Sequence, residues 1–199
     1  MASTTRTFIA VAVPEAQGQK LTRLQTLLAP DLPGVRWSET SPFHMTLAFL
    51  GDVADTDLND VCRAVASAAE AAEPFDLRLE GLGAFPHPAR PRVVWVGATG
   101  PGLVPLETLQ KEIANAVRGV GHPPDDDRFH AHVTLGRLKP GRGPSPDMNP
   151  LVKHYRTWSA GSFHVAEAVV FASTLTPDGP IYAPLGRAPL RGGKPGRNA

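Results

Sequence analysis

The sequence has little cysteine: Cys62 is the single one among 199 residues. One cysteine excludes an internal disulfide and is typical of proteins from a reducing compartment. The chain also lacks any apolar run near the roughly 20 residues that a membrane-spanning helix needs. Residues 1–7 lack the apolar stretch of a signal peptide. We therefore expect a cytoplasmic protein that does not bind membranes.

An excess of charge of one sign is missing too. Twenty Lys and Arg residues stand against 19 Asp and Glu, which leaves a formal net charge of +1 at pH 7. Proteins that coat nucleic acid without regard to its sequence are normally much more basic. If RNA is the partner, we expect it to be bound locally, at an end or in a cleft.

Two common catalytic motifs are absent. The chain has neither a Gly-rich phosphate-binding loop nor a G-x-S-x-G nucleophile turn, which disfavours nucleoside triphosphatases and serine hydrolases. The 21 prolines and 19 glycines follow no period and therefore mark turns and loops. A chain of this length suits one domain or a compact pair of lobes.

The pattern of apolar residues predicts a mixture of strands and helices. Strand-like runs cover residues 6–13, 43–50, 75–82, 93–96, 129–138, 165–173 and 181–185. Helical spacing covers residues 21–28, 58–69 and 106–117, with a short helix over 147–155. Strands outnumber helices, and the two do not alternate regularly, so the α+β class is favoured over a doubly wound sheet.

Two segments share the pattern His-x-Thr-Leu, at residues 44–47 and 132–135. Each falls in a predicted strand, where side chains alternate between the two faces. His44 and Thr46 therefore point to one face, as do His132 and Thr134, while the residues between them point to the other. Two such strands can place two imidazoles on opposite sides of one small ligand.

This arrangement suits hydrolysis of a cyclic phosphodiester. Histidine titrates near neutrality, so one imidazole can take a proton from water while the other protonates the leaving oxygen. Threonine hydroxyls can donate to the non-bridging oxygens, so no metal is required. A lone H-x-T is more often an ordinary strand histidine, but its repetition favours catalytic roles for His44 and His132, with Thr46 and Thr134 binding the substrate.

At these residues the chain resembles the 2H phosphoesterases, specifically the bacterial and archaeal RNA 2′,3′-cyclic phosphodiesterases, also called 2′-5′ RNA ligases. The resemblance covers nearly all of residues 6–186. The blocks that carry it are RTFIAV at 6–11, VRW at 35–37, HMTLAFLG at 44–51, LGAFP at 82–86, RPRVVWVG at 90–97, FHAHVTLGR at 129–137 and STLTPDGPIY at 173–182.

The resemblance implies a single bilobal α+β domain over residues 1–189. Each lobe would be an antiparallel sheet with helices outside, and the active-site groove would lie between the two pseudo-symmetric sheets. We expect the basic tail, residues 190–199, to be disordered. The implied substrates are RNA ends or short oligonucleotides with a 2′,3′-cyclic phosphate. No cofactor, metal or obligatory protein partner is implied, and we expect a monomer.

The resemblance also implies roles for single residues. It makes His44 the acid toward the 3′ leaving oxygen and His132 the base toward water, so that the product carries a 2′-phosphate. Because coupled imidazoles can exchange roles, this assignment is separate from the pairing itself. Arg137 matches an arginine that the family places at the substrate, where it can stack on a base or pair with phosphate.

One position departs from the family pattern. The family commonly has proline before its second histidine, whereas this chain has Ala131, preceded by His130. Strand alternation would put His130 and His132 on one face, and we choose His132 because only it has threonine two residues later. A zinc site built on this pair is disfavoured, since cysteines and carboxylates are missing nearby.

Other residues and functions stay open. Trp37 and Phe43 suit either the core or stacking on a base, and Arg90 and Arg92 suit either the groove or a solvated loop. Two alternatives to hydrolysis remain: ATP-independent 2′-5′ joining of RNA ends by the same histidines, and non-catalytic binding of RNA ends. Water at high concentration favours hydrolysis over joining, and two intact His-x-Thr motifs disfavour a mere binder.

Overall fold

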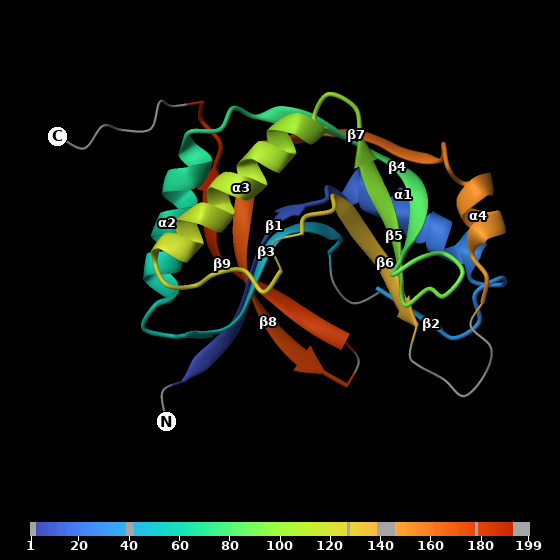
Figure 1. Ribbon diagram of the computed structural model, residues 1–199, viewed down its shortest axis with the longest axis horizontal. Helices are drawn as coiled ribbons and strands as arrows, with labels where there is room; N and C mark the ends of the chain where they lie inside the picture. The colour runs from blue at the N-terminus through green and yellow to red at the C-terminus, as the bar shows by residue number, and fades with distance from the viewer. Residues whose placement is uncertain (1–2, 39–41, 127, 139–145, 178, 193–199) are drawn as a thin grey trace.

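The computed structural model describes residues 3–38, 42–126, 128–138, 146–177 and 179–192. Its strands form two antiparallel sheets (Figure 1). The four-stranded sheet has the order β3 (His44–Ala54), β1 (Thr4–Ala12), β8 (Glu167–Thr176), β9 (Gly179–Pro189). The five-stranded sheet has the order β2 (Val35–Trp37), β6 (His132–Leu138), β5 (Val93–Thr99), β4 (Phe75–Phe85), β7 (Ser159–Val165). The predicted α+β class and paired sheets are confirmed.

Two helices pack against the sheet opposite to the one whose strand they follow in the chain. Helix α1 (Glu15–Leu28) follows β1 of the four-stranded sheet, yet it packs against β6 and β7 of the other. Helix α3 (Leu103–Gly119) follows β5 of the five-stranded sheet and packs against β3 and against α2 (Leu58–Glu70). In Figure 1, α2 and α3 lie over one lobe and α1 and the short α4 (Asn149–His154) over the other. Each lobe is thus held by a helix that the opposite lobe supplies.

One continuous apolar core runs through both lobes because of this exchange. Most residues of the predicted apolar helix faces are buried in it: Leu21, Leu24, Leu28, Val61, Val65, Leu106, Leu109, Ile113 and Val117. Leu27, expected on the same face as Leu24 and Leu28, is instead 59% exposed. The residues between and after His and Thr in the two repeated segments, Met45, Leu47, Val133 and Leu135, are buried there as well. A smaller cluster of Phe8, Ala10, Val169 and Phe171 covers the opposite face of the four-stranded sheet. The alternation predicted for both segments is confirmed.

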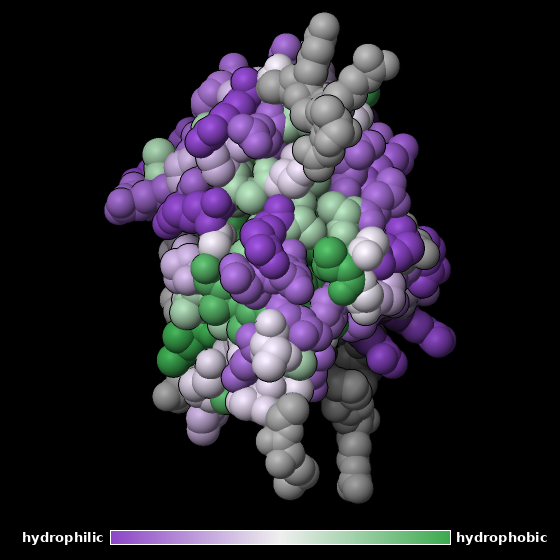
Figure 2. Space-filling view, turned by 90° about the vertical axis from the view of Figure 1, so that its left-hand side faces the viewer, coloured by the Kyte–Doolittle hydropathy of each residue, from purple (hydrophilic) through white to green (hydrophobic). Residues whose placement is uncertain are grey.

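The outer surface over α2 and α3 is mostly polar. Figure 2 shows hydrophilic side chains over most of this side, with apolar residues in small separate areas. The apolar faces of α2 and α3 are therefore buried in the core. Among the described residues, no helix combines the length and the apolarity needed to cross a bilayer.

Several strand limits differ from the predicted ones. β2 and β7 were absent from the prediction, because β2 has three residues and β7 is interrupted by Gly161 at φ +89°. The strand predicted from residue 129 begins at His132, and β4 and β9 are longer than expected. Residues 190–192 of the expected tail are among the described residues: Leu190 is buried and its N–H donates to Ala166 O. Residues 193–199 of the predicted tail lie outside the described residues.

Candidate active site

A groove between the two sheets contains all five residues that the sequence singled out. His44 and Thr46 enter it from β3, and His132, Thr134 and Arg137 enter it from β6. The two strands contact each other at the lobe boundary, and the groove has a volume of about 350 Å³. It is therefore of a size that suits a nucleotide end rather than a folded macromolecule.

A β-bulge in each strand sets which side chains face the groove. In β3, Ala12 pairs with His44, Ala10 with Thr46 and Phe8 with Phe49, so Leu47 is left out of the register. In β6, Gly97 pairs with His132, Trp95 with Thr134 and Val93 with Arg137, so Leu135 is left out. Paired residues share a face, and an inserted residue shifts the alternation by one.

The bulges explain why Arg137 reaches the groove. It is the fifth residue after His132, and simple alternation would turn its side chain away. The bulge at Leu135 restores it to the face of His132 and Thr134. Phe49 occupies the same place five residues after His44, and it also lines the groove. One wall therefore ends in an aromatic ring and the other in a guanidinium.

A buried glutamine, on a helix that follows a strand of the opposite sheet, bonds to the carbonyl at each bulge. Gln110 of α3 donates from Nε2 to Leu47 O at 3.2 Å, and Gln25 of α1 donates to Leu135 O at 2.8 Å. The two glutamines are 7% and 5% exposed. A carbonyl that is displaced from a ladder and buried needs such a donor, since leaving it unpaired costs roughly 1–3 kcal/mol. β3 is therefore bonded to α3, which follows a strand of the five-stranded sheet, and β6 is bonded to α1, which follows a strand of the four-stranded sheet.

A repeated sequence motif indicates these two glutamines, although neither is among the predicted site residues. Both occupy the fifth position of L-x-x-L-Q, at residues 21–25 and again at residues 106–110. In both helices that position belongs to the buried face. A polar residue repeated on an apolar helix face indicates a buried hydrogen bond.

The imidazoles of His44 and His132 are each oriented by the carbonyl two residues before them. His44 Nδ1 lies 3.2 Å from Pro42 O, and His132 Nδ1 lies 2.7 Å from His130 O. A carbonyl oxygen only accepts hydrogen bonds, so Nδ1 must carry a proton in both rings. Nε2 is then the atom free to gain or lose a proton at the substrate.

Aromatic rings support each imidazole from the side. The His44 ring lies 4.9 Å from the rings of Phe8 and Tyr182, and the His132 ring lies 5.0 Å from that of Phe85. Trp95 lies flat over Gly83, where a Cβ atom would be only 2.1 Å from the indole, and its ring is 4.8 Å from His130. These packed rings limit the rotation of both catalytic side chains.

His130 stands apart from the groove. Its exposed ring packs against Trp95 and lines a separate cavity with Glu107 and Arg156, while its carbonyl bonds to His132 and its ring centroid lies 6.1 Å from that of His132. The choice of His132 over His130 therefore agrees with the geometry. Phe129, His130 and Ala131 precede the first residue of β6, so strand alternation does not apply to them.

Burial and neighbouring charges lower the pKa values of His44 and His132. Burial lowers the pKa of His44 below its ordinary 6.5, the hydrogen bond to Pro42 opposes this, and the charges of His132 and Arg137 add to it. The pKa of His132 is lowered by burial first, against the hydrogen bond to His130, and then by the charges of His130 and Arg137. Without an anion between them, both rings therefore favour the neutral form.

Comparison with known proteins agrees with this arrangement. The family described as LigT like phosphoesterase matches residues 11–95 and 100–182. The chain belongs to the LigT-like phosphoesterase family. A relative from Aeropyrum pernix, named RNA 2′,3′-cyclic phosphodiesterase, is 36% identical over 166 residues, which are 83% of this chain and 92% of the relative. A protein of the same name from Archaeoglobus fulgidus is 34% identical over 180 residues, 90% of this chain and 97% of that protein.

A solved structure shares the fold of this LigT-like phosphoesterase over nearly its whole length. The crystal structure of a Thermus thermophilus protein has a TM-score of 0.75 at 29% identity. The match covers 94% of this chain and 98% of that one. The resemblance to the 2H phosphoesterases that was inferred from seven short blocks is thereby confirmed.

Several groove residues were not singled out as site residues from sequence. Tyr182 of β9 and Arg36 of β2 line the groove, as do Trp37 and Phe43, for which core and groove had both been considered. Burial raises the pKa of the Tyr182 hydroxyl, against the opposing charges of Arg137 and Arg6. Tyr182 therefore stays protonated and able to donate a hydrogen bond to a substrate.

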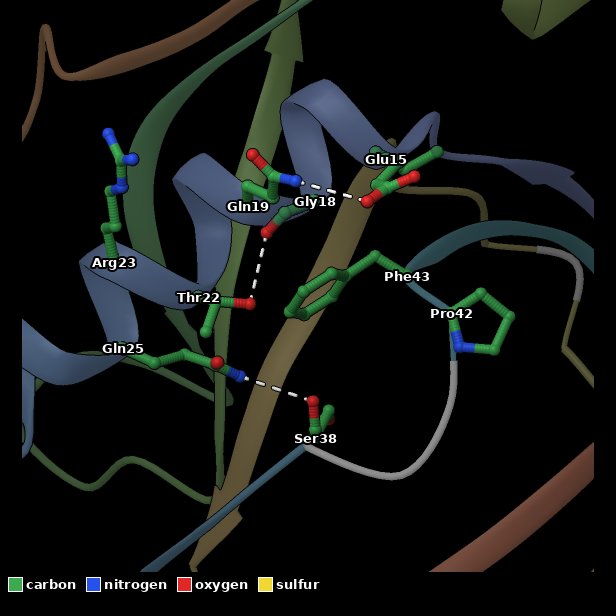
Figure 3. A pocket seen from close by; sticks show the side chains of 10 residues that line it. Glu15, Gly18, Gln19, Thr22, Arg23, Gln25, Ser38, Pro42 and Phe43 are labelled. Atoms are coloured by element: carbon green, nitrogen blue, oxygen red, sulfur yellow. Dashed lines mark hydrogen bonds between the residues drawn. The ribbon is translucent and has the colours of Figure 1, made fainter.

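Phe43 separates the groove from a second cavity beside α1. Figure 3 shows its ring lying against the helix near Gly18, while Gln25 extends toward Ser38 O at 3.5 Å. A Cβ at Gly18 would lie 3.6 Å from the Phe43 ring, so the two are in ordinary contact. Arg90 and Arg92 lie outside the catalytic groove, in a neighbouring cavity. In the described ranges, no group of three or more His, Cys, Asp or Glu side chains is arranged to hold a metal ion.

The glutamine contacts predict an asymmetry between two matched variants. Gln110→Met keeps the side-chain volume but removes the donor to Leu47 O, and we expect kcat to fall about tenfold with little change in KM. Gln25→Met should be milder, because Leu135 O also accepts the N–H of Ser38 at 2.8 Å. The loss of one buried hydrogen bond changes stability by only roughly 1–3 kcal/mol. Activity that falls only in proportion to the unfolded fraction would contradict a positioning role.

The lowered pKa values predict the pH profile. The profile of kcat/KM, which reports the free enzyme, should be bell-shaped with its maximum below pH 6.5. Because a bound phosphate anion favours imidazolium, the kcat profile should lie at higher pH. Arg137→Gln removes a positive charge that lowers both pKa values, so its kcat/KM profile should move to higher pH as well. A profile that moves the other way would contradict these electrostatics.

Proposed function

We propose that this chain hydrolyses 2′,3′-cyclic phosphate ends of RNA to 2′-phosphate ends without a metal. The observation that carries the proposal is the pair of imidazoles on opposite walls of one groove, each with Nδ1 held by a carbonyl and Nε2 free. The name shared by the relatives from Aeropyrum pernix and Archaeoglobus fulgidus, RNA 2′,3′-cyclic phosphodiesterase, supports it.

The reaction needs one proton taken and one proton given. His132, neutral at Nε2, accepts a proton from the attacking water as its oxygen bonds to phosphorus. His44, protonated at Nε2, donates a proton to the 3′ oxygen as the bond from phosphorus to that oxygen breaks. The two histidines end with exchanged protonation states, and exchange with solvent restores them. The phosphate remains on the 2′ oxygen.

The remaining groove residues stabilise charge on the phosphate. Within the described part of the chain, the hydroxyls of Thr46 and Thr134 have no other hydrogen-bond partner, which leaves them free to donate to the non-bridging oxygens. The Arg137 guanidinium adds a fixed positive charge at the exposed end of the groove. Such fixed donors act where negative charge grows in the transition state.

The test is hydrolysis of 2′,3′-cyclic AMP in the presence of EDTA. We expect full activity with the chelator and a 2′-phosphate product by ³¹P NMR. General acid or base catalysis contributes roughly 10²–10⁴-fold, so His44→Ala and His132→Ala should each lose at least a hundredfold in kcat. His130→Ala keeps the carbonyl that holds His132 and serves as the matched control, with activity within a few fold of wild type.

Other outcomes would overturn the proposal. Loss of activity in EDTA would mean that a metal takes part, and near-full activity in either catalytic variant would exclude the two-histidine mechanism. Binding of cyclic-ended RNA without turnover would indicate a binding module. Joining of a 5′-hydroxyl RNA to the cyclic end, faster than hydrolysis, would indicate a 2′-5′ ligase that uses the same histidines in the reverse sense.

A further inference from the structure

Another cavity, distinct from the one beside α1, lies at the connection between β4 and β5. It is lined by Phe85, Pro86, His87, Arg90, Arg92 and Val93 and has a volume of about 580 Å³. Phe85 links the two sites, because the edge of its ring meets the His132 ring at a centroid distance of 5.0 Å. We call residues 86–92 the basic hairpin. Phe85 is therefore the residue through which the basic hairpin contacts the His132 side of the groove.

The cations of the basic hairpin have no acidic partner. Arg90, Arg92 and His87 form no ion pair with any described residue, and no described residue that lines this cavity or the catalytic groove is acidic. Five arginines elsewhere are paired with acids, namely Arg63, Arg78, Arg128, Arg187 and Arg191, whereas the groove residues Arg36 and Arg137 form no ion pair with a described residue. A chain whose net charge is only +1 thus keeps unpaired positive charge beside its groove.

The backbone of the basic hairpin is well anchored. The N–H of Arg92 donates to Phe85 O at 2.6 Å, and the N–H of Arg90 donates to His87 O at 3.1 Å. On the outside, Met148 N donates to Pro88 O and Leu138 N donates to Arg92 O, both at 2.9 Å. The arginine side chains therefore extend from a fixed support, which lowers the entropic cost of binding a ligand.

The chemistry of the proposed substrate says what this ligand is. A 2′,3′-cyclic phosphate ends the RNA strand, so the rest of the strand leaves the groove only through the 5′ oxygen of the terminal nucleotide. The next groups are phosphodiesters and unstacked bases. A positively charged groove combined with an aromatic side chain is the usual site for single-stranded nucleic acid.

We propose that the basic hairpin binds the single-stranded RNA on the 5′ side of the cyclic phosphate, with Arg90 and Arg92 on its phosphodiesters and Phe85 against a base. This inference rests on the proposed function and narrows its substrate from cyclic nucleotides to oligonucleotides. The cavity beside α1 in Figure 3 is less suited to the strand, since its lining includes the acid Glu15 as well as the cation Arg23, which lies at the opposite end of it.

The test compares two substrates that share the reacting group. kcat/KM is measured for 2′,3′-cyclic AMP and for a hexanucleotide with a 2′,3′-cyclic phosphate, over a range of salt concentrations. In the double variant Arg90→Gln with Arg92→Gln, we expect at least a tenfold loss with the hexanucleotide and less than a twofold change with cyclic AMP. Two lost phosphate contacts should also reduce the slope of log(kcat/KM) against log salt by about 1.4 for the hexanucleotide.

The matched control removes the same charge elsewhere. Arg63→Gln with Arg191→Gln eliminates two arginines that pair with Asp60 and Glu70 at α2, and both substrates should react as with wild type. Equal losses for both substrates in the hairpin variant, or no loss for either, would overturn the inference. If wild type hydrolyses neither substrate, the proposed function itself has failed; hydrolysis of cyclic AMP with an unaffected hairpin variant contradicts only the RNA path.

Discussion

Two buried carbonyl groups hold this molecule's active site together. Leu47 O and Leu135 O lie at the bulges of β3 and β6. Each accepts a hydrogen bond from a glutamine on a helix that follows a strand of the opposite sheet. The arrangement is reciprocal: Gln25 of α1 donates to β6, and Gln110 of α3 donates to β3. Because the bulges turn Phe49 and Arg137 to the face of the histidines and threonines, these contacts also decide which side chains complete the groove.

This constraint also shapes the protonation chemistry. Each imidazole is packed among rings and bonded through Nδ1 to a carbonyl, so only Nε2 is left for the substrate. Burial and positive neighbours lower both pKa values, and an anionic phosphate between the rings reverses that effect. A bound phosphate anion would therefore favour the protonated form of an adjacent imidazole.

Sequence predicted much of this because the governing patterns are local. The repeated His-x-Thr-Leu and strand alternation were enough to place two imidazole–hydroxyl pairs on one face and Leu135 in the core. The position of Arg137 followed only from family resemblance, since alternation alone points it away from His132. The bulge that corrects this depends on the pairing of β5 with β6, which is a tertiary contact. The three-residue β2 and the partner of Gln25 are non-local for the same reason.

The central claim is that both histidines present Nε2 to the groove from a fixed Nδ1–H tautomer with a lowered pKa. Long-range ¹H–¹⁵N NMR spectra of uniformly labelled protein, recorded through a pH titration, measure tautomer and pKa for each ring. The account predicts the Nδ1–H form for His44 and His132 in the neutral state, midpoints below 6.5 for both, and higher midpoints when inorganic phosphate is added. An Nε2–H tautomer in either ring, or a midpoint above 6.5 in the free protein, would contradict it.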